Sequence, residues 1–129
     1  MKHLFLSSKD SLDNYPNNTT SDFTIELKDK LTLDGTWECA LREIKFAEED
    51  LNEDCYIFTD ICVDSYVLNN HLPVLRQISN SEKFVNPYYF QVNRKEIFSL
   101  RLYIRNQNLQ LPSTLPESVH CVLSLRKRP

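Results

Sequence analysis

Hydrophobic and polar residues alternate along most of the chain with a period of two, the pattern of a strand with one buried face. The alternation is clear over 23–27, 97–105 and 119–125. Residues 55–63 are rich in β-branched and aromatic side chains at both parities, which predicts a central strand covered on two sides. No segment has the 3.6-residue period of an amphipathic helix, so we expect an all-β chain.

The segment 36–46 predicts a strand whose buried face changes along its length. Apolar side chains occupy odd positions up to Leu41 and even positions from Ile44 onward. A strand can accommodate such a change with a bulge, or by having both faces covered. We favour a bulge near Arg42 and Glu43.

Turn residues separate the predicted strands. Asp34 and Gly35 form the strongest turn signal, and Gly35 is the only glycine of the chain. This turn closes either a tight hairpin or a looser corner. Asn69–Asn70 marks a second turn, and Pro73 restricts the strand near 72–78 to a sheet edge or to a strand start.

These elements predict an antiparallel β-sandwich of seven to eight strands, in one domain spanning 1–129. Residues 1–21 are a candidate N-terminal arm, and 126–129 form a basic tail. The predicted core residues share the inward parity of their strands. They are Trp37, Cys39, Leu41, Leu100, Leu102, Ile104, Cys121 and Leu123.

Composition argues against an enzyme. With one glycine in 129 residues, the chain has no GxxxxGK or GxGxxG phosphate loop and no GxSxG nucleophile elbow. A net charge of −3 is too balanced for a nucleic-acid footprint over the whole domain. We therefore expect no catalytic activity, no cofactor and no small-molecule substrate.

Cysteines and acidic residues offer no recognisable reactive or metal site. The four cysteines are Cys39, Cys55, Cys62 and Cys121. None forms a CxxC pair, and the histidines lie at no zinc-like spacing from them. We expect buried free thiols in a reducing compartment rather than a catalytic thiol. The acidic stretch 48–54 is expected to be a solvated connection, and no apolar run predicts a signal peptide or a membrane span.

Two groups of residues are candidates for a partner interface. The first is aromatic and comprises Phe84, Tyr88, Tyr89 and Phe90, which could equally form core at a sheet end. Stacking of single-stranded nucleic acid on these rings is a weaker interpretation. The second is the basic run Arg126, Lys127 and Arg128, which is either a solvated chain end or a contact to an acidic protein surface or to nucleic acid.

A series of motifs near the two ends of the chain carries a family resemblance. The matching residues are Tyr15, Pro16, Asn18, Thr19, Phe23, Thr24, Leu27, Leu33, Gly35, Trp37, Glu38, Leu41, Glu43 and Ile44, with Leu123, Leu125 and Arg126 near the end. This series resembles virion proteins encoded by Polinton (Maverick) elements and adintoviruses. Their closing motif is Leu-x-Phe-Arg, where this chain has leucine in place of phenylalanine.

The resemblance implies a virion structural protein with a single jelly-roll fold, in a minor capsid or penton-like role. It implies a homo-oligomer, trimeric or pentameric, that contacts other capsid proteins through its arm and tail. Such a protein would be found in the virion and assembled in the host nucleus or cytoplasm. The alternative is a monomeric β-sandwich binding module that recognises a host protein or a carbohydrate.

Overall fold

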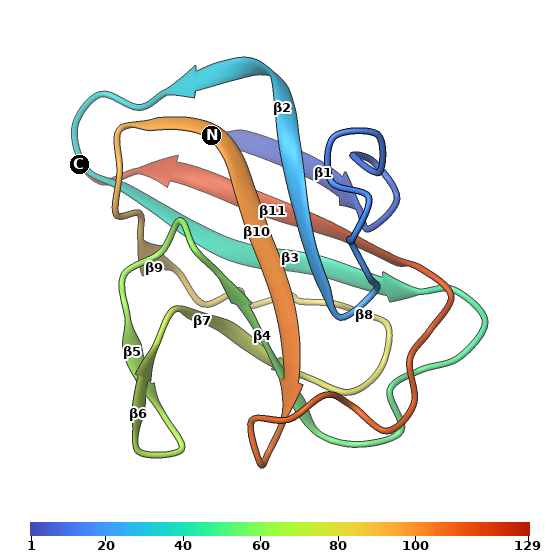
Figure 1. Cartoon of the computed structure of the whole chain (residues 1–129). Coiled ribbons are helices and arrows are strands. Elements are labelled where there is room, and N and C mark those ends of the chain that lie inside the picture. Colours follow the sequence, from blue (N-terminus) through green and yellow to red (C-terminus); the bar gives the residue numbers. More distant parts are fainter.

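The computed structural model describes residues 1–129, and its regular elements are all strands (Figure 1). The strands are β1 (Lys2–Ser7), β2 (Asp22–Thr32), β3 (Trp37–Phe46), β4 (Cys55–Thr59), β5 (Ser65–Val67), β6 (Asn70–Leu72), β7 (Val74–Ile78), β8 (Glu82–Lys83), β9 (Phe90–Gln91), β10 (Glu96–Asn106) and β11 (Val119–Lys127). These eleven strands exceed the predicted seven to eight. The difference comes from four short strands of two or three residues each, which are β5, β6, β8 and β9. None of the elements is an apolar helix of membrane-spanning length.

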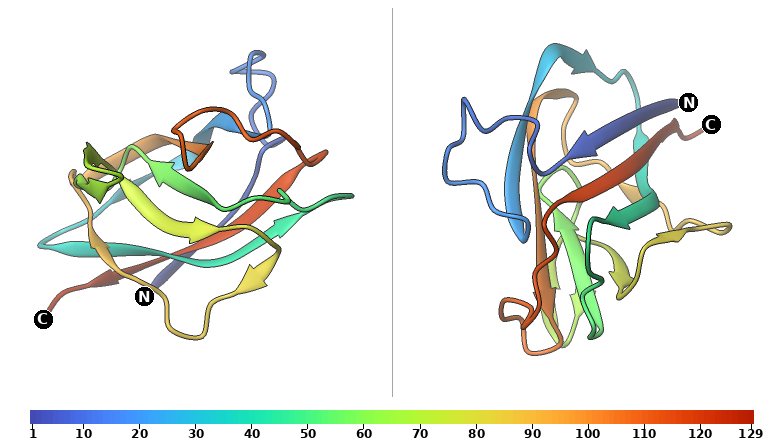
Figure 2. Two further views of the ribbon diagram at one scale, coloured as in Figure 1. Left: turned by 90° about the horizontal axis from the view of Figure 1, so that it is seen from below. Right: turned by 90° about the vertical axis from the view of Figure 1, so that its right-hand side faces the viewer.

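Two antiparallel sheets pack face to face, which confirms the predicted β-sandwich (Figures 1 and 2). The first sheet has the strand order β1-β11-β3-β8, and β9 also pairs with β3. The second sheet has the order β2-β10-β4-β7. Residues from both sheets share one buried apolar cluster, so the main core lies between the two layers.

The strand pairings are nested along the chain. β1 pairs with β11, β2 with β10, β3 with β8 and β9, and β4 with β7, all antiparallel. Each pairing therefore encloses the next one in sequence, like a long hairpin folded over on itself. The pairs β11–β3 and β10–β4 then join these hairpins into the two sheets.

The predicted bulge in β3 is confirmed. Val122 of β11 lies opposite Glu43, whereas the next residue, Leu123, lies opposite Leu41. Arg42 is therefore the extra residue on β3, and it is exposed. The bulge allows Leu41 and Ile44 to face the same core despite their opposite parity.

The Asp34–Gly35 turn is a corner between the two sheets rather than a hairpin. It connects β2 of the second sheet to β3 of the first sheet. Gly35 has a φ of 85°, in the left-handed region that favours glycine. The Asp34 carbonyl accepts a hydrogen bond of 2.9 Å from the indole Nε1 of Trp37, which holds the corner against the start of β3.

Seven of the eight predicted core residues are buried, and Trp37 is the exception. Trp37 is only partly buried and packs against the edge of the core cluster. It is the first residue of β3, where the sandwich opens to solvent, and its indole N–H needs a polar partner. The Asp34 carbonyl at the corner supplies that partner.

The prediction that the central strand is apolar on both faces is confirmed for β4. Ile57 faces the main core, while Phe58 belongs to a second small cluster with Val67 and Val74 on the outer face of the second sheet. The β5–β6 hairpin supplies Val67 to this cluster. Leu68 and Asn69 link its two strands with positive φ values, as a tight two-residue hairpin loop requires.

The prediction of an N-terminal arm over 1–21 is wrong for its first part. Residues 2–7 form β1, which pairs along its length with β11 as an edge strand of the first sheet. Alternating Leu4 and Leu6 face the core side of the sheet, and their burial holds the strand in place.

We expect Thr59→Val to stabilise the protein. The Thr59 hydroxyl is fully buried and has no hydrogen-bond partner, and valine has nearly the same shape without the polar group. Removing an unsatisfied buried hydroxyl should raise the free energy of unfolding by about 1 kcal/mol. Thermal unfolding should show a Tm increase of about 3 °C, whereas the exposed Thr32→Val control in β2 should change Tm little. A lower Tm for Thr59→Val would contradict this account.

Candidate functional site

The predicted aromatic interface divides between core and surface. Phe84 is buried in the core cluster, so its assignment as an interface anchor is wrong. Tyr88 is 58% exposed. The Arg76 guanidinium carbon lies 4.2 Å from the centroid of the Phe84 ring and 3.7 Å from the centroid of the Tyr88 ring. Arg76 also donates a 2.8 Å hydrogen bond to the Asn86 carbonyl, which fixes the loop between β8 and β9.

Tyr89 and Phe90 are partly buried, so they also fail to form an exposed anchor with Tyr88. Phe90 packs against both apolar clusters from β9. The Tyr89 ring is covered by Arg126, whose guanidinium carbon lies 3.5 Å from the ring centroid. The two predicted interface groups therefore contact each other within the chain.

The basic tail is not free. Arg126 and Lys127 continue β11 along β3, where the Arg126 Nε lies 3.1 Å from a Glu38 carboxylate oxygen. The Lys127 ammonium lies 3.3 Å from the Asp34 carboxylate and lowers the pKa of that carboxyl. Acidic residues of the same chain thus compensate much of the tail charge, which removes the main basis for predicting a nucleic-acid contact.

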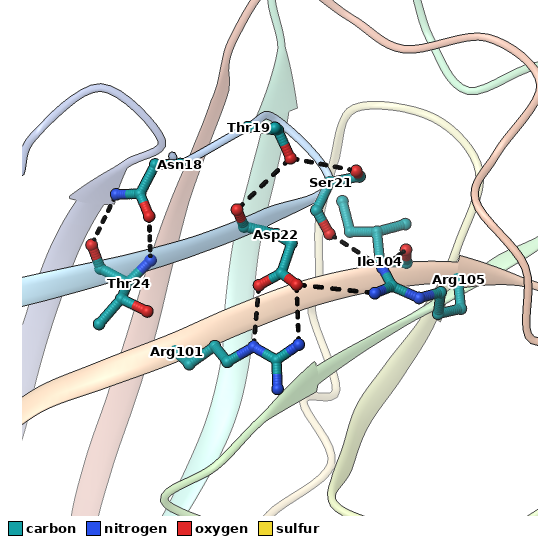
Figure 3. A network of polar contacts seen from close by, with 8 residues as sticks. All are labelled: Asn18, Thr19, Ser21, Asp22, Thr24, Arg101, Ile104 and Arg105. Atoms are coloured by element: carbon teal, nitrogen blue, oxygen red, sulfur yellow. Dashed lines mark hydrogen bonds and ion pairs between the residues drawn. The ribbon is translucent and has the colours of Figure 1, made fainter. Parts of the chain in front are cut away.

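The strongest polar cluster lies on the outer face of the second sheet (Figure 3). Asp22 begins β2, and Arg101 lies on β10 beside it. The Arg101 Nε and Nη2 atoms donate to the two Asp22 carboxylate oxygens at 2.8 Å and 2.7 Å. This bidentate pair lowers the pKa of Asp22 and raises the pKa of Arg101.

Arg105 is the second cation beside Asp22, and the backbone holds it in position. Its Nη1 donates to the carbonyls of Ile104 at 2.8 Å and Ser21 at 3.3 Å. Its Nη2 lies 3.6 Å from the Asp22 oxygen that Arg101 already occupies. Tyr103 lies between the two arginines in the sequence of β10, and its ring centroid is 4.4 Å from the guanidinium carbon of Arg101 and 5.3 Å from that of Arg105.

Asn18 fastens the loop before β2 to the edge of that strand (Figure 3). Its side-chain amide donates to the Thr24 carbonyl at 2.8 Å and accepts from the Thr24 N–H at 3.0 Å. The amide thus makes the two backbone hydrogen bonds that one residue of a neighbouring strand would make. Ser11 accepts from the Glu26 N–H at 3.0 Å further along the same edge. These contacts protect part of the β2 edge from pairing with another chain.

An open groove of about 690 Å³ lies between this loop and the loop that connects β10 to β11. Its walls carry polar side chains from one loop and exposed leucines from the other. The lining residues are Asn14, Tyr15, Pro16, Asn17, Asn18, Thr19, Ser21, Asp22, Thr24, Arg105, Leu111 and Leu115. Nothing local in the sequence identified the contact of Asp22 with Arg101 and Arg105, or this groove.

All four cysteines are buried as free thiols. Burial raises the pKa of Cys121 to about 12 and that of Cys55 to about 11. A hydrogen bond with Cys62, together with burial, also raises the pKa of Cys39. These three thiols therefore lack the thiolate character of a nucleophile near neutral pH. No group of three or more His, Cys, Asp or Glu side chains is arranged to hold a metal ion.

Comparison with known proteins finds no family model, no curated protein and no solved structure that matches the chain.

We expect the Asp22–Arg101 pair to stabilise the protein in a pH-dependent way. Because the folded pKa of Asp22 is lowered, its contribution is complete above the ordinary carboxyl pKa and is lost as pH falls through the folded value. Asp22→Asn should cost roughly 0.5–1 kcal/mol at pH 7, a value limited by the partial exposure of both side chains. Thermal unfolding between pH 2 and 7 should show the wild-type advantage shrinking at low pH.

Asp13→Asn is the matched control for this measurement. Asp13 is exposed and makes no hydrogen bond or ion pair with the rest of the chain. Its replacement should leave Tm nearly unchanged at every pH. An equal loss of stability in both variants, or a loss in Asp22→Asn that persists at pH 2, would refute the role of the ion pair.

Proposed function

We propose that the protein is a single jelly-roll component of a viral or virus-like particle, with a minor capsid or penton-like role, and that it acts through protein–protein assembly. The nested pairing of strands is the structural observation that supports the jelly-roll part of this proposal. A jelly roll has eight strands in two sheets and is an architecture of viral capsid proteins. Counting β8 and β9 as one interrupted strand and setting aside the β5–β6 hairpin leaves eight principal strands, four in each sheet.

The sequence resemblance to Polinton and adintovirus virion proteins supports the same role. Its motifs fall on structurally important positions, because Gly35 forms the corner between the sheets and Asn18 protects the β2 edge. Lectin domains and cupins also use jelly rolls, so the fold by itself does not select a capsid role. The resemblance is the reason to prefer that role here.

The outer edge of β1 is a suitable assembly surface. The Ser7 N–H donates to Asp10 at 2.8 Å and therefore faces away from β11. Because hydrogen-bonding directions alternate along an antiparallel pair, the backbone groups of His3 and Phe5 face the same free edge. The Phe5 side chain is 76% exposed. A strand from a neighbouring subunit could pair with this edge and cover Phe5.

The decisive experiment combines light scattering of the purified protein with cryo-electron microscopy of particles from producing cells. We expect a homo-oligomer, trimeric or pentameric, and density for the chain in the particle. Phe5→Asp should weaken assembly, while Phe98→Asp, which alters an exposed phenylalanine of the other sheet, should leave it intact.

A strictly monomeric protein that is absent from particles would overturn the proposal. A stable stoichiometric complex with a non-viral protein, or with a carbohydrate, would favour the alternative of a monomeric binding module instead.

A further inference from the structure

The groove beside Asp22 combines a charged floor with one polar wall and one wall that carries exposed leucines. Its only charged lining residues are Asp22 and Arg105. Leu111 is 57% exposed and Leu115 is 45% exposed, both on the wall formed by the β10–β11 loop. The volume of about 690 Å³ lies within the ~300–1,000 Å³ range of ligand-binding clefts.

The charge balance of the groove leaves one cation without a full partner. Asp22 is neutralised by the bidentate hydrogen bonds from Arg101. Arg105 approaches Asp22 only to 3.6 Å, and its Nε–H donates to no group of the protein. The two carbonyl contacts of its Nη1 hold the guanidinium in place before any ligand binds. Such a preorganised arginine is suited to receive an anion.

The surroundings favour a singly charged anion attached to an apolar group. Arg101, Arg105 and Asp22 together carry one excess positive charge, which the charge of a phosphate dianion exceeds. A carboxylate matches the single excess positive charge. Leu111 and Leu115 offer aliphatic surface, which an apolar side chain covers better than a sugar hydroxyl does.

We propose that this groove binds a peptide segment in which an Asp or Glu side chain meets Arg105 and neighbouring apolar side chains pack on Leu111 and Leu115. The site lies on the second sheet, whereas the β1 edge belongs to the first sheet. The proposal therefore does not depend on assembly into particles, and its test can fail or succeed independently of that role.

The test is selection of peptides from a random heptapeptide library displayed on phage, with the full-length protein as bait. We expect selected peptides to share an acidic residue flanked by leucine, isoleucine, valine or phenylalanine. Titration of the best peptide, followed by NMR, should perturb the signals of Arg105, Tyr15 and Leu111. Replacing the acidic residue of that peptide by its amide should weaken binding about tenfold.

Two pairs of variants test whether the peptide binds in the groove. Arg105→Gln should weaken binding about tenfold, whereas Arg42→Gln, at the exposed bulge of the other sheet, should have no effect. Because Arg105→Gln also removes backbone contacts, exposed Leu111 provides a second test. Leu111→Asp should bind the acidic peptide at least about tenfold more weakly than Leu111→Lys, since only the charge differs in sign.

Several outcomes would overturn the proposal. These are the absence of any selected peptide, a consensus without an acidic residue, equal binding by Leu111→Asp and Leu111→Lys, and perturbation of Arg105 by inorganic phosphate or glucuronic acid at the affinity of the peptide.

Discussion

Replacing Leu102 by alanine is expected to lower the free energy of unfolding by about 2–5 kcal/mol. Leu102 is completely buried in β10, opposite Phe23 of β2 on one side and Thr59 of β4 on the other. The paired strands on both sides limit relaxation around the missing side chain, so a cavity should remain in the core between the sheets. Urea unfolding of the purified variant measures this loss through the change in midpoint.

Phe98→Ala is the matched control on the same strand. It removes a larger apolar side chain, but Phe98 is 59% exposed on the outer face of β10. Its replacement should change stability by less than about 0.5 kcal/mol. If both variants lost the same stability, or if Leu102→Ala lost less than Phe98→Ala, the assignment of the two faces of β10 would be wrong.

Alternation in the sequence predicted the two faces of β10 correctly from Leu100 onward, but it failed at the start of the strand, where a register shift between Ile97 and Ser99 buries Ile97 and exposes Phe98. Leu100, Leu102 and Ile104 are buried, and Arg101 is exposed, because a strand with one face on the core enforces a period of two. The change of parity in β3 also predicted the bulge at Arg42 correctly. Both inferences depend only on residues that are close in sequence.

Long-range register could not be predicted in the same way. Asp22 and Arg101 are separated by 79 positions in sequence and meet only because β2 pairs with β10 in one register. The basic tail shows the same limitation, since Glu38 and Asp34 lie on and before a neighbouring strand. A local run of Arg126, Lys127 and Arg128 gave no sign that acidic residues would compensate it.

The aromatic segment failed as a prediction for a related reason. Phe84 and Tyr88 are close in sequence, yet one is buried and the other exposed. Arg76 of β7 lies between their rings, and its position depends on how the β7–β8 connection folds. Composition alone identifies such side chains as able to contact a partner, but packing decides which of them remain available.

Gly35→Val is expected to destabilise the protein by about 1–3 kcal/mol. At a φ of 85°, any Cβ is strained, and a Cβ built at Gly35 would lie 3.0 Å from Cε of Lys127. Gly35→Asn isolates the backbone contribution, because asparagine has the same Cβ but tolerates positive φ better, so it should cost less than valine. Combining Gly35→Val with Lys127→Ala removes the contact and should recover only a small part of the loss, since the flexible lysine end can move. Thermal unfolding of the wild type, Gly35→Val, Gly35→Asn and the double variant separates the backbone strain from the contact with Lys127. An unchanged Tm for Gly35→Val would show that the corner between the sheets does not need glycine.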